Sequence, residues 1–218
     1  YVESGNVGGW VEIGTIAFVD KKFIQEFKNS NYFVSVKEKF PIYDPIFREY
    51  VKVATIFPKK GDEYIIAKKD DDLNAVISYI NLNDNEVEAM PLAFNTENRI
   101  KIAKQLMDEP YGWGGFLNNR DCSSFTQDYF ATFGKYLHRN SKSQISNGKY
   151  LDMSNLSNDE KKEFVKKNGV PFSTLVYLKG HIMLYIGIKG NEPLVMHNMW
   201  SVRLKDETGK KYRYIIGK

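Results

Sequence analysis

Cysteine is what this sequence most lacks: Cys122 stands alone among 218 residues. A single thiol cannot form an internal disulfide, so the chain has no disulfide framework. The sequence also lacks any apolar run near the roughly eighteen residues that a membrane span needs. Residues 1–9 have neither the basic start nor the apolar centre of a signal peptide. We therefore expect a soluble chain without a membrane span. Because it begins at Tyr1 and not at Met, we also expect an upstream segment that carried any export signal.

The sequence also lacks a large excess of charge of either sign. The chain carries 31 Lys and Arg against 27 Asp and Glu, a formal net charge of +4, and lysine pairs such as Lys59-Lys60 are scattered. This distribution is typical of solvated faces and not of a nucleic-acid surface, although a weak attraction to anionic polymers stays open. The 14 Tyr and 14 Phe indicate a folded chain throughout.

The first half of the chain reads as short strands separated by Gly, Pro, Asn and Asp. The predicted strands are residues 10–18, 32–36, 50–57, 64–67, 76–80 and 86–89, with a short helix at 23–28. This pattern predicts a small β-barrel. The hydrophobic spacing becomes helical after Thr96, a candidate cap, and we place a domain boundary at residue 95. The predicted domains are residues 1–95 and 96–218.

The second half predicts helices followed by an antiparallel sheet, an α+β arrangement. One helix begins at Cys122 with Asp121 as its cap and an apolar stripe that runs to Leu137. Another begins at Ser157, whose spacing from Glu160 is that of a capping box, and it ends at 168–169. Strands follow at residues 174–178, 181–188, 194–197 and 212–216.

Cys122 is the candidate nucleophile. It lies between the loop Tyr111-Gly112-Trp113-Gly114-Gly115 and an amphipathic helix, so its sulfur falls in the first helical turn. Unpaired N–H groups and the helix dipole favour an anion there, and we expect an acidified thiol. The alternative is an inert core cysteine, but Asp121 and Ser123 flank it.

Two of the three histidines fall in the predicted sheet, where neighbouring strands would place His181 and His197 side by side. A base aligned by a second polar group suits a cysteine nucleophile. Ordinary strand-end histidines are the alternative, and His138 is interpreted as a cation at a helix C-terminus. A zinc site of Cys122, His181 and His197 stays open but lacks ligands paired at helical or knuckle spacing. We expect no metal and no cofactor.

Four blocks in order resemble the NlpC/P60 family of bacterial cell-wall cysteine peptidases. They are 110–115 (PYGWGG), 121–125 (DCSSF), 180–187 (GHIMLYIG) and 196–197 (MH). The first half, with Gly9-Trp10-Val11, is more loosely similar to the bacterial SH3-type (SH3b) barrels that often precede such domains. Residues 1–28 would then be the tail of one barrel, and about 29–93 a second. The resemblance implies a papain-like catalytic domain.

The resemblance also implies roles and a substrate. Cys122 would attack the γ-D-glutamyl bond to a diamino acid such as meso-diaminopimelate in peptidoglycan stem peptides. His181 would act as base and then as acid, and His197 would orient it. Tyr111 would lie beside the oxyanion. Asp121, Ser123 and Trp113 would contact substrate: Asp121 the free L-Ala amine, and Ser123 the D-Glu carboxylate.

Two departures from the family pattern affect the shape of the subsites. Ser124 stands where many members have Gly, and Phe172-Ser173-Thr174 replaces the usual Pro-Gly-Asp. The open alternatives are a catalytically silent peptidoglycan-binding module and an acyltransferase on the same fold. We expect a monomer in the bacterial cell envelope, periplasmic or secreted, with the cytoplasm as the alternative.

Overall fold

The computed structural model describes residues 1–4 and 8–216, and it divides into two compact units. Unit 1 comprises Tyr1–Gln105 and Ala131–Lys135, and unit 2 comprises Leu106–Phe130 and Tyr136–Lys218. The domain boundary at residue 95 stays a prediction.

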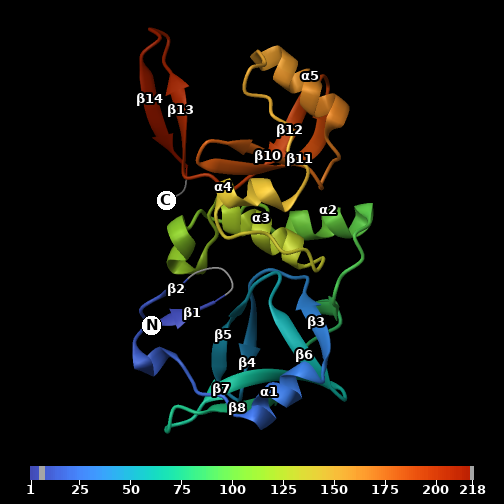
Figure 1. Cartoon of the computed structure of the whole chain (residues 1–218), viewed down its shortest axis with the longest axis vertical. Helices are drawn as coiled ribbons and strands as arrows, with labels where there is room; N and C mark the ends of the chain where they lie inside the picture. Colours follow the sequence, from blue (N-terminus) through green and yellow to red (C-terminus); the bar gives the residue numbers. More distant parts are fainter. Residues whose placement is uncertain (5–7, 217–218) are drawn as a thin grey trace. The chain divides into compact units, whose positions relative to one another are not determined.

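Unit 1 is built on an antiparallel sheet with the strand order β8-β7-β6-β3-β9 (Figure 1). Its strands are β3 (Asn31–Ser35), β6 (Ile56–Lys60), β7 (Glu63–Lys69), β8 (Ala75–Ile80) and β9 (Val87–Ala89), and β4 (Phe40–Tyr43) pairs separately with β5 (Phe47–Val51). Alternation along β4 buries Phe40 and Ile42 and exposes Pro41 and Tyr43. The core of this unit consists of Phe40, Ile42, Val51, Phe57, Tyr64, Ile66, Ile80 and Val87.

Four of the six predicted strands in this unit are confirmed as β3, β7, β8 and β9. The predicted strand 50–57 is wrong, because a turn with Ala54 at φ 73° separates β5 from β6. Strand β4 was missed. The predicted strand 10–18 is also wrong: residues Ile13–Thr15 form the 3-10 helix η1, and only Phe18 bridges to Asn74.

The remaining segments of unit 1 are short. Strands β1 (Val2–Glu3) and β2 (Gly8–Gly9) pair with each other. Helix α1 (Lys21–Lys28) begins where the Asp20 side chain accepts from the Phe23 N–H, and it packs along β8 (Figure 1). Among residues 1–4 and 8–216 no closed barrel is present. The five-stranded sheet is open at β8 and β9, so the predicted SH3-like barrel is not confirmed.

Helix α2 spans Thr96–Gln105. Thr96 was predicted as the cap that precedes the helix, but it is the first helical residue. The Asn95 side chain, and not Thr96, accepts from a first-turn N–H, that of Asn98, at 2.9 Å. Ile102 and Ala103 are the buried residues of this helix.

The helices of unit 2 include two that the sequence predicted. Helix α3 (Cys122–Ala131) follows Asp121 as predicted, but it ends at Ala131, before the turn at Gly134 (φ 69°). His138 therefore does not lie at a helix C-terminus, and that interpretation is wrong. Helix α5 (Asn158–Asn168) is capped by Ser157, and the predicted capping box with Glu160 is confirmed. The other helical segments are η2 (Trp113–Asn118), α4 (Ser141–Gln144) and η3 (Ile145–Asn147).

The main sheet of unit 2 has the antiparallel order β10-β11-β12. Its strands are β10 (Leu175–Leu178), β11 (His181–Lys189) and β12 (Glu192–Met196), close to the predicted ranges. Strand β11 is central and buries Ile182, Leu184 and Tyr185. Helix α5 lies over this sheet, and Lys162 on it pairs with Glu192 at 2.9 Å (Figure 1).

A separate hairpin of β13 (Ser201–Lys205) and β14 (Lys211–Ile215) projects from unit 2 (Figure 1). Strand β14 is the predicted strand near 212–216, and β13 was missed. The mixture of helix and sheet in the molecule is as predicted. In the part of the chain that the structure describes, every helix is too short or too polar to cross a membrane.

Candidate functional site

The loop that precedes Cys122 folds back on itself. Tyr111 forms a parallel bridge with Arg120, and the Gly112 N–H donates to the Arg120 carbonyl at 2.9 Å. A Cβ on Gly112 would lie 2.5 Å from the Phe116 carbonyl oxygen, so this close approach requires glycine. The loop thereby places Tyr111 next to the start of α3.

Arg120 anchors this start from inside the unit. Its side chain is 2% exposed, and its Nε donates to the Asp128 carboxylate at 2.7 Å. Its carbonyl accepts from the Asn198 side-chain amide at 3.0 Å. The residue before Asp121 therefore ties the beginning of α3 to the segment that follows His197.

Cys122 is the first residue of α3 and is 8% exposed. Burial raises the pKa of the Cys122 thiol, whereas the backbone N–H groups of Ile182 and Ser123 act to lower it. The net direction is upward, so the predicted acidification of the free site is not borne out. The N–H groups expected at a helix start are present, but loss of water around the sulfur outweighs them. A thiolate here needs a further positive charge.

His181, the first residue of β11, and His197, which directly follows β12, lie side by side as predicted. His181 Nε2 is 2.7 Å from His197 Nδ1. The next residue after His181, Ile182, directs its N–H to the Cys122 sulfur. Strand β11 therefore passes the start of α3 at Ile182, directly after His181.

The hydrogen bond between the histidines distinguishes the two ring nitrogens of His181. His181 uses Nε2 toward His197, which leaves its Nδ1 as the nitrogen that can take up or release a proton. Burial, together with the neighbouring charge of His181, lowers the pKa of His197 to about 4. Burial also lowers the pKa of His181. His197 thus stays neutral near neutral pH and can accept the Nε2–H of a protonated His181.

Tyr111 is suited to donate a hydrogen bond. Burial, and the negative charges that Cys122 and Asp121 carry when ionised, raise the pKa of Tyr111 to about 12. The phenol therefore keeps its proton in the neutral range. Trp113 lies next to it, with a ring distance of 6.3 Å, and is 73% exposed.

The Asp121 carboxylate is held by α3 and by one arginine. Its Oδ1 accepts from the N–H groups of Ser123 at 3.1 Å and Ser124 at 2.8 Å. Arg139 binds both carboxylate oxygens, at 3.1 and 2.9 Å, and its Nη1 lies 3.0 Å from Ser123 Oγ. Burial opposes ionisation, but hydrogen bonds from Arg139 and Ser124 bring the pKa of Asp121 below its usual value.

Sequence reasoning missed Arg139 and Gln144. Gln144 is 3% exposed, accepts from Thr126 Oγ1 at 2.7 Å, and donates to the Ser123 and His138 carbonyls at 2.9 Å each. These contacts fix the segment that carries Arg139. One signal was available in the sequence: Asn140 caps α4, so a short helix start immediately follows the arginine.

A zinc set is not assembled in residues 1–4 and 8–216, where no three His, Cys, Asp or Glu side chains gather closely enough to hold a metal ion. The chemistry available at the site is that of a thiol, an imidazole pair, a phenol and an arginine–carboxylate pair.

Unit 2 is thus a mixed helix and sheet domain with a buried cysteine at the start of α3 and two hydrogen-bonded histidines, one at the start of β11 and one after β12. The NlpC/P60 family model matches residues 108–214, and the chain contains an NlpC/P60 family domain. No curated protein matches the chain.

Two solved structures are similar. One, described as a novel NlpC/P60 endopeptidase from Photobacterium damselae subsp. piscicida, is 26% identical with a TM-score of 0.83, over 96% of this chain. The chain spans 50% of that protein. An NlpC/P60 family protein from Bacillus cereus is 18% identical with a TM-score of 0.49, over 82% of this chain and 61% of that one.

Proposed function

We propose that the chain is a cysteine endopeptidase of the bacterial cell wall. Its substrate would be the peptidoglycan stem peptide, cleaved between γ-D-glutamate and a diamino acid such as meso-diaminopimelate. The NlpC/P60 domain supports a cell-wall peptidase in general. The observation that carries the proposal is the 2.7 Å hydrogen bond between His181 and His197, next to Ile182, whose backbone N–H acts to lower the pKa of the Cys122 thiol.

The proposed reaction is acyl transfer through a thioester. His181 Nδ1 takes the proton of the Cys122 thiol, and the thiolate attacks the γ-carbonyl carbon of D-glutamate. The Tyr111 hydroxyl and the Cys122 N–H donate to the oxyanion that forms. His181 then gives its proton to the leaving amine as the C–N bond breaks. A water molecule, deprotonated by His181, hydrolyses the thioester and restores the thiol.

His197 would keep His181 in the reactive tautomer. When His181 is doubly protonated, its Nε2–H needs an acceptor, and a neutral His197 offers Nδ1 at 2.7 Å. The resulting imidazolium supplies the positive charge that the buried thiolate requires. Burial raises the pKa of Cys122, so the thiol does not lose its proton to bulk water. The thiolate and the imidazolium of His181 would instead form in one step, as the proton passes from the sulfur to His181.

Substrate contacts follow from the residues around the nucleophile. Ser123 would hold the α-carboxylate of D-glutamate, and Asp121 would contact the L-Ala amine while remaining paired with Arg139. Trp113 would cover the peptide with its exposed ring. The Arg139 guanidinium beside Ser123 Oγ adds positive charge where that carboxylate would bind.

The wider features of the chain are proposed on the same basis. Residues 96–218 would adopt a papain-like arrangement, and residues 1–95 would include an SH3-type wall-binding region. The protein would act as a monomer in the cell envelope, without a cofactor.

Digestion of purified peptidoglycan tests the proposal directly. The intact chain should release fragments that end in γ-D-glutamate and fragments that begin with a free diamino acid, as identified by mass spectrometry. Cys122→Ala should release neither, and a chelator should leave the yield unchanged. Binding without any release would favour a silent wall-binding module, and loss of activity with stoichiometric zinc would favour a metalloenzyme.

A further inference from the structure

The β13–β14 hairpin separates two kinds of side chain onto its two faces. Side chains directly opposite each other in an antiparallel pair share a face, and faces alternate along each strand. In this register Arg203 stands opposite Arg213, and Lys205 stands opposite Lys211. All four cations therefore share one face, and all four are exposed.

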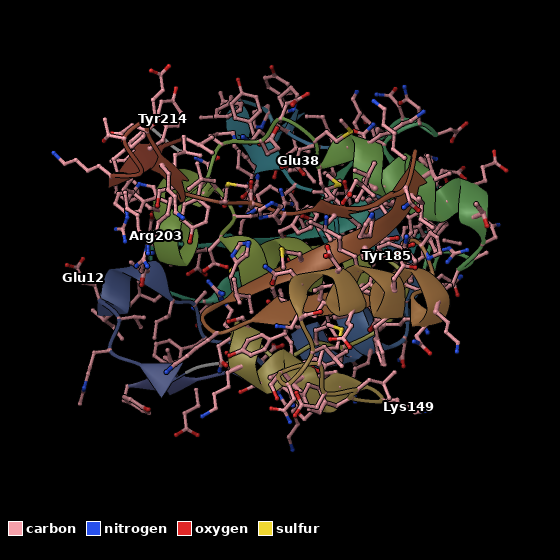
Figure 2. All side chains as sticks on the ribbon, turned by 90° about the horizontal axis from the view of Figure 1, so that it is seen from above. Glu12, Glu38, Lys149, Tyr185, Arg203 and Tyr214 are labelled. Carbon is pink, nitrogen blue, oxygen red and sulfur yellow. The ribbon has the colours of Figure 1, made fainter. Side chains whose placement is uncertain are left out.

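The other face of the hairpin is apolar. Its two cross-strand pairs are Val202 with Tyr214 and Leu204 with Tyr212. Figure 2 labels one residue of each face, Arg203 and Tyr214, on opposite sides of the hairpin. The two chemistries are thus kept apart on a ribbon of only two strands.

The four cations do not stabilise the hairpin. Like charges placed directly opposite each other destabilise a strand pair. Within residues 1–4 and 8–216 none of the four cations forms an ion pair with a carboxylate. Asp206, at the turn of the hairpin, instead accepts from the Thr208 side chain and from backbone N–H groups. The face therefore presents uncompensated positive charge to a ligand.

This face is connected to the candidate site by a row of rings. The Arg213 guanidinium lies 5.7 Å from the centre of the Trp200 ring. Trp200 meets Trp113 edge to face at 6.1 Å, and Trp113 meets Tyr111 at 6.3 Å. Trp200 is the residue before β13 and is the third residue after His197. The rings of Trp113 and Trp200 therefore link Tyr111 to Arg213 of the cationic face.

We infer that the cationic face of the β13–β14 hairpin, with Trp200, binds the carboxylate-bearing peptidoglycan polymer beyond the bond that is cleaved. The inference rests on the proposed function for the identity of the polymer. Arginine and lysine match the carboxylates of stem peptides, and an indole ring offers a stacking surface for a flat or ring-shaped group. A membrane is a poorer match, since the apolar face would lie on the bilayer and direct the cations away from it.

The test measures binding without turnover. Full-length Cys122→Ala protein is sedimented with purified insoluble peptidoglycan over a range of salt concentrations. In this background K205Q/K211Q should bind roughly three- to tenfold more weakly and with a shallower salt dependence. The matched control, K149Q/K167Q, removes the same charge from exposed positions outside the hairpin, and should bind like the parent. Amidating the carboxylates of the peptidoglycan should abolish the difference between K205Q/K211Q and the parent.

Several results would overturn the inference. The first is equal peptidoglycan binding by K205Q/K211Q and the parent, and the second is an equal loss of binding in K205Q/K211Q and the control. The third is that K205Q/K211Q binds vesicles of anionic phospholipid more weakly than the parent does but binds peptidoglycan equally well. Melting temperatures check the fold, and K205Q/K211Q should melt no lower than the parent because it removes like-charge pairs. Cleavage is measured separately with Cys122 intact: a soluble stem peptide should be hydrolysed equally by K205Q/K211Q and the unmodified chain. Absence of that cleavage in both would count against the proposed function, while the binding result would still decide the inference.

Discussion

Cys122 occupies surroundings that resist its ionisation. Burial raises the pKa of its thiol, and the charge of Asp121 acts in the same direction. In the proposed mechanism the imidazolium of His181 compensates for both. The reactive form is therefore a property of the cysteine and histidine together, and it can be examined without any substrate.

We predict that His181→Ala moves the alkylation of Cys122 to higher pH. Without an imidazolium nearby, only the effects that raise the pKa of Cys122 and the opposing N–H groups remain. Half-maximal reaction with iodoacetamide should then lie above the roughly pH 8.5 of an ordinary thiol. The rate is measured across pH for the parent and the variant, and His138→Ala is the control. Identical curves for the parent and His181→Ala would show that His181 does not partner the sulfur.

We predict that the low pKa of His197 makes the stability of the chain depend on pH. Its pKa is about 4 in the folded chain, against roughly 6.5 for an unfolded histidine. Between these values the unfolded chain binds more protons, so this contribution to the free energy of unfolding is complete above about pH 6.5 and is lost as pH falls toward 4. Burial lowers the pKa of His181, which adds a loss in the same direction. His197→Gln should flatten the pH profile measured by chemical denaturation. A profile unchanged from the parent would contradict a buried neutral His197.

Arg139 provides a prediction about charge next to the nucleophile. Arg139→Gln leaves the Asp121 carboxylate without its ion pair, so Cys122 alkylation should shift to higher pH and turnover should fall about ten- to a hundredfold. Arg139→Lys should restore part of both effects, and Asp121→Asn combined with Arg139→Gln should reverse the shift in alkylation pH. If the double variant shifts as far as Arg139→Gln alone, the Asp121 charge is not the cause.

At the scale of elements, the capping box of α5 is the clearest case of sequence specifying structure. Ser157 Oγ accepts from the Glu160 N–H, and the Glu160 carboxylate accepts from the Ser157 N–H at 2.8 Å. Ser157→Ala should lower the free energy of unfolding by about 1 kcal/mol in urea titrations. Ser157→Asp keeps an acceptor at the cap and should lose much less. Equal losses in the two variants would indicate that the cap does not stabilise α5.

Elements with local signals were predicted, and those set by distant contacts were not. The strands of the β10-β11-β12 sheet carry continuous apolar runs, so their ranges were close to those observed. The end of α3 was missed because Phe133 and Leu137 stay buried beyond the helix and extend its apolar pattern. Strand β13 was missed because its alternation of Val202, Arg203 and Leu204 is short, although its partner β14 begins only six residues after it ends.

The site shows the same division. Cys122, His181 and His197 were predicted from residue type and from the order of helix and strands, and of these predictions the structure confirms that the two imidazoles lie together. The Arg139 contact to Asp121 spans 18 residues of sequence through a loop, and no periodic pattern predicts such a pairing. The upward pKa of Cys122 was also missed, because burial of a single sulfur depends on packing that the sequence does not display.

At the scale of the whole molecule, the architecture of the first half of the chain was the hardest to predict from the sequence. Its strand pattern suggested a barrel, whereas unit 1 contains an open five-stranded sheet and a separate hairpin. Short strands with turn residues are compatible with both arrangements, because closure depends on pairing between strands far apart in sequence. An SH3-type wall-binding role for this region therefore rests on the proposal for the chain.

The measurement that tests the central claim most directly is hydrolysis of the defined peptide L-Ala-γ-D-Glu-meso-diaminopimelate in heavy-oxygen water, followed by mass spectrometry. The account predicts free diaminopimelate and L-Ala-D-Glu carrying one heavy oxygen in its new γ-carboxylate, with neither product formed by Cys122→Ala. A γ-glutamyl product joined to an amine and free of heavy oxygen would instead show acyl transfer. Unchanged peptide with the intact chain, or equal cleavage by Cys122→Ala, would contradict a cysteine endopeptidase that cleaves this bond.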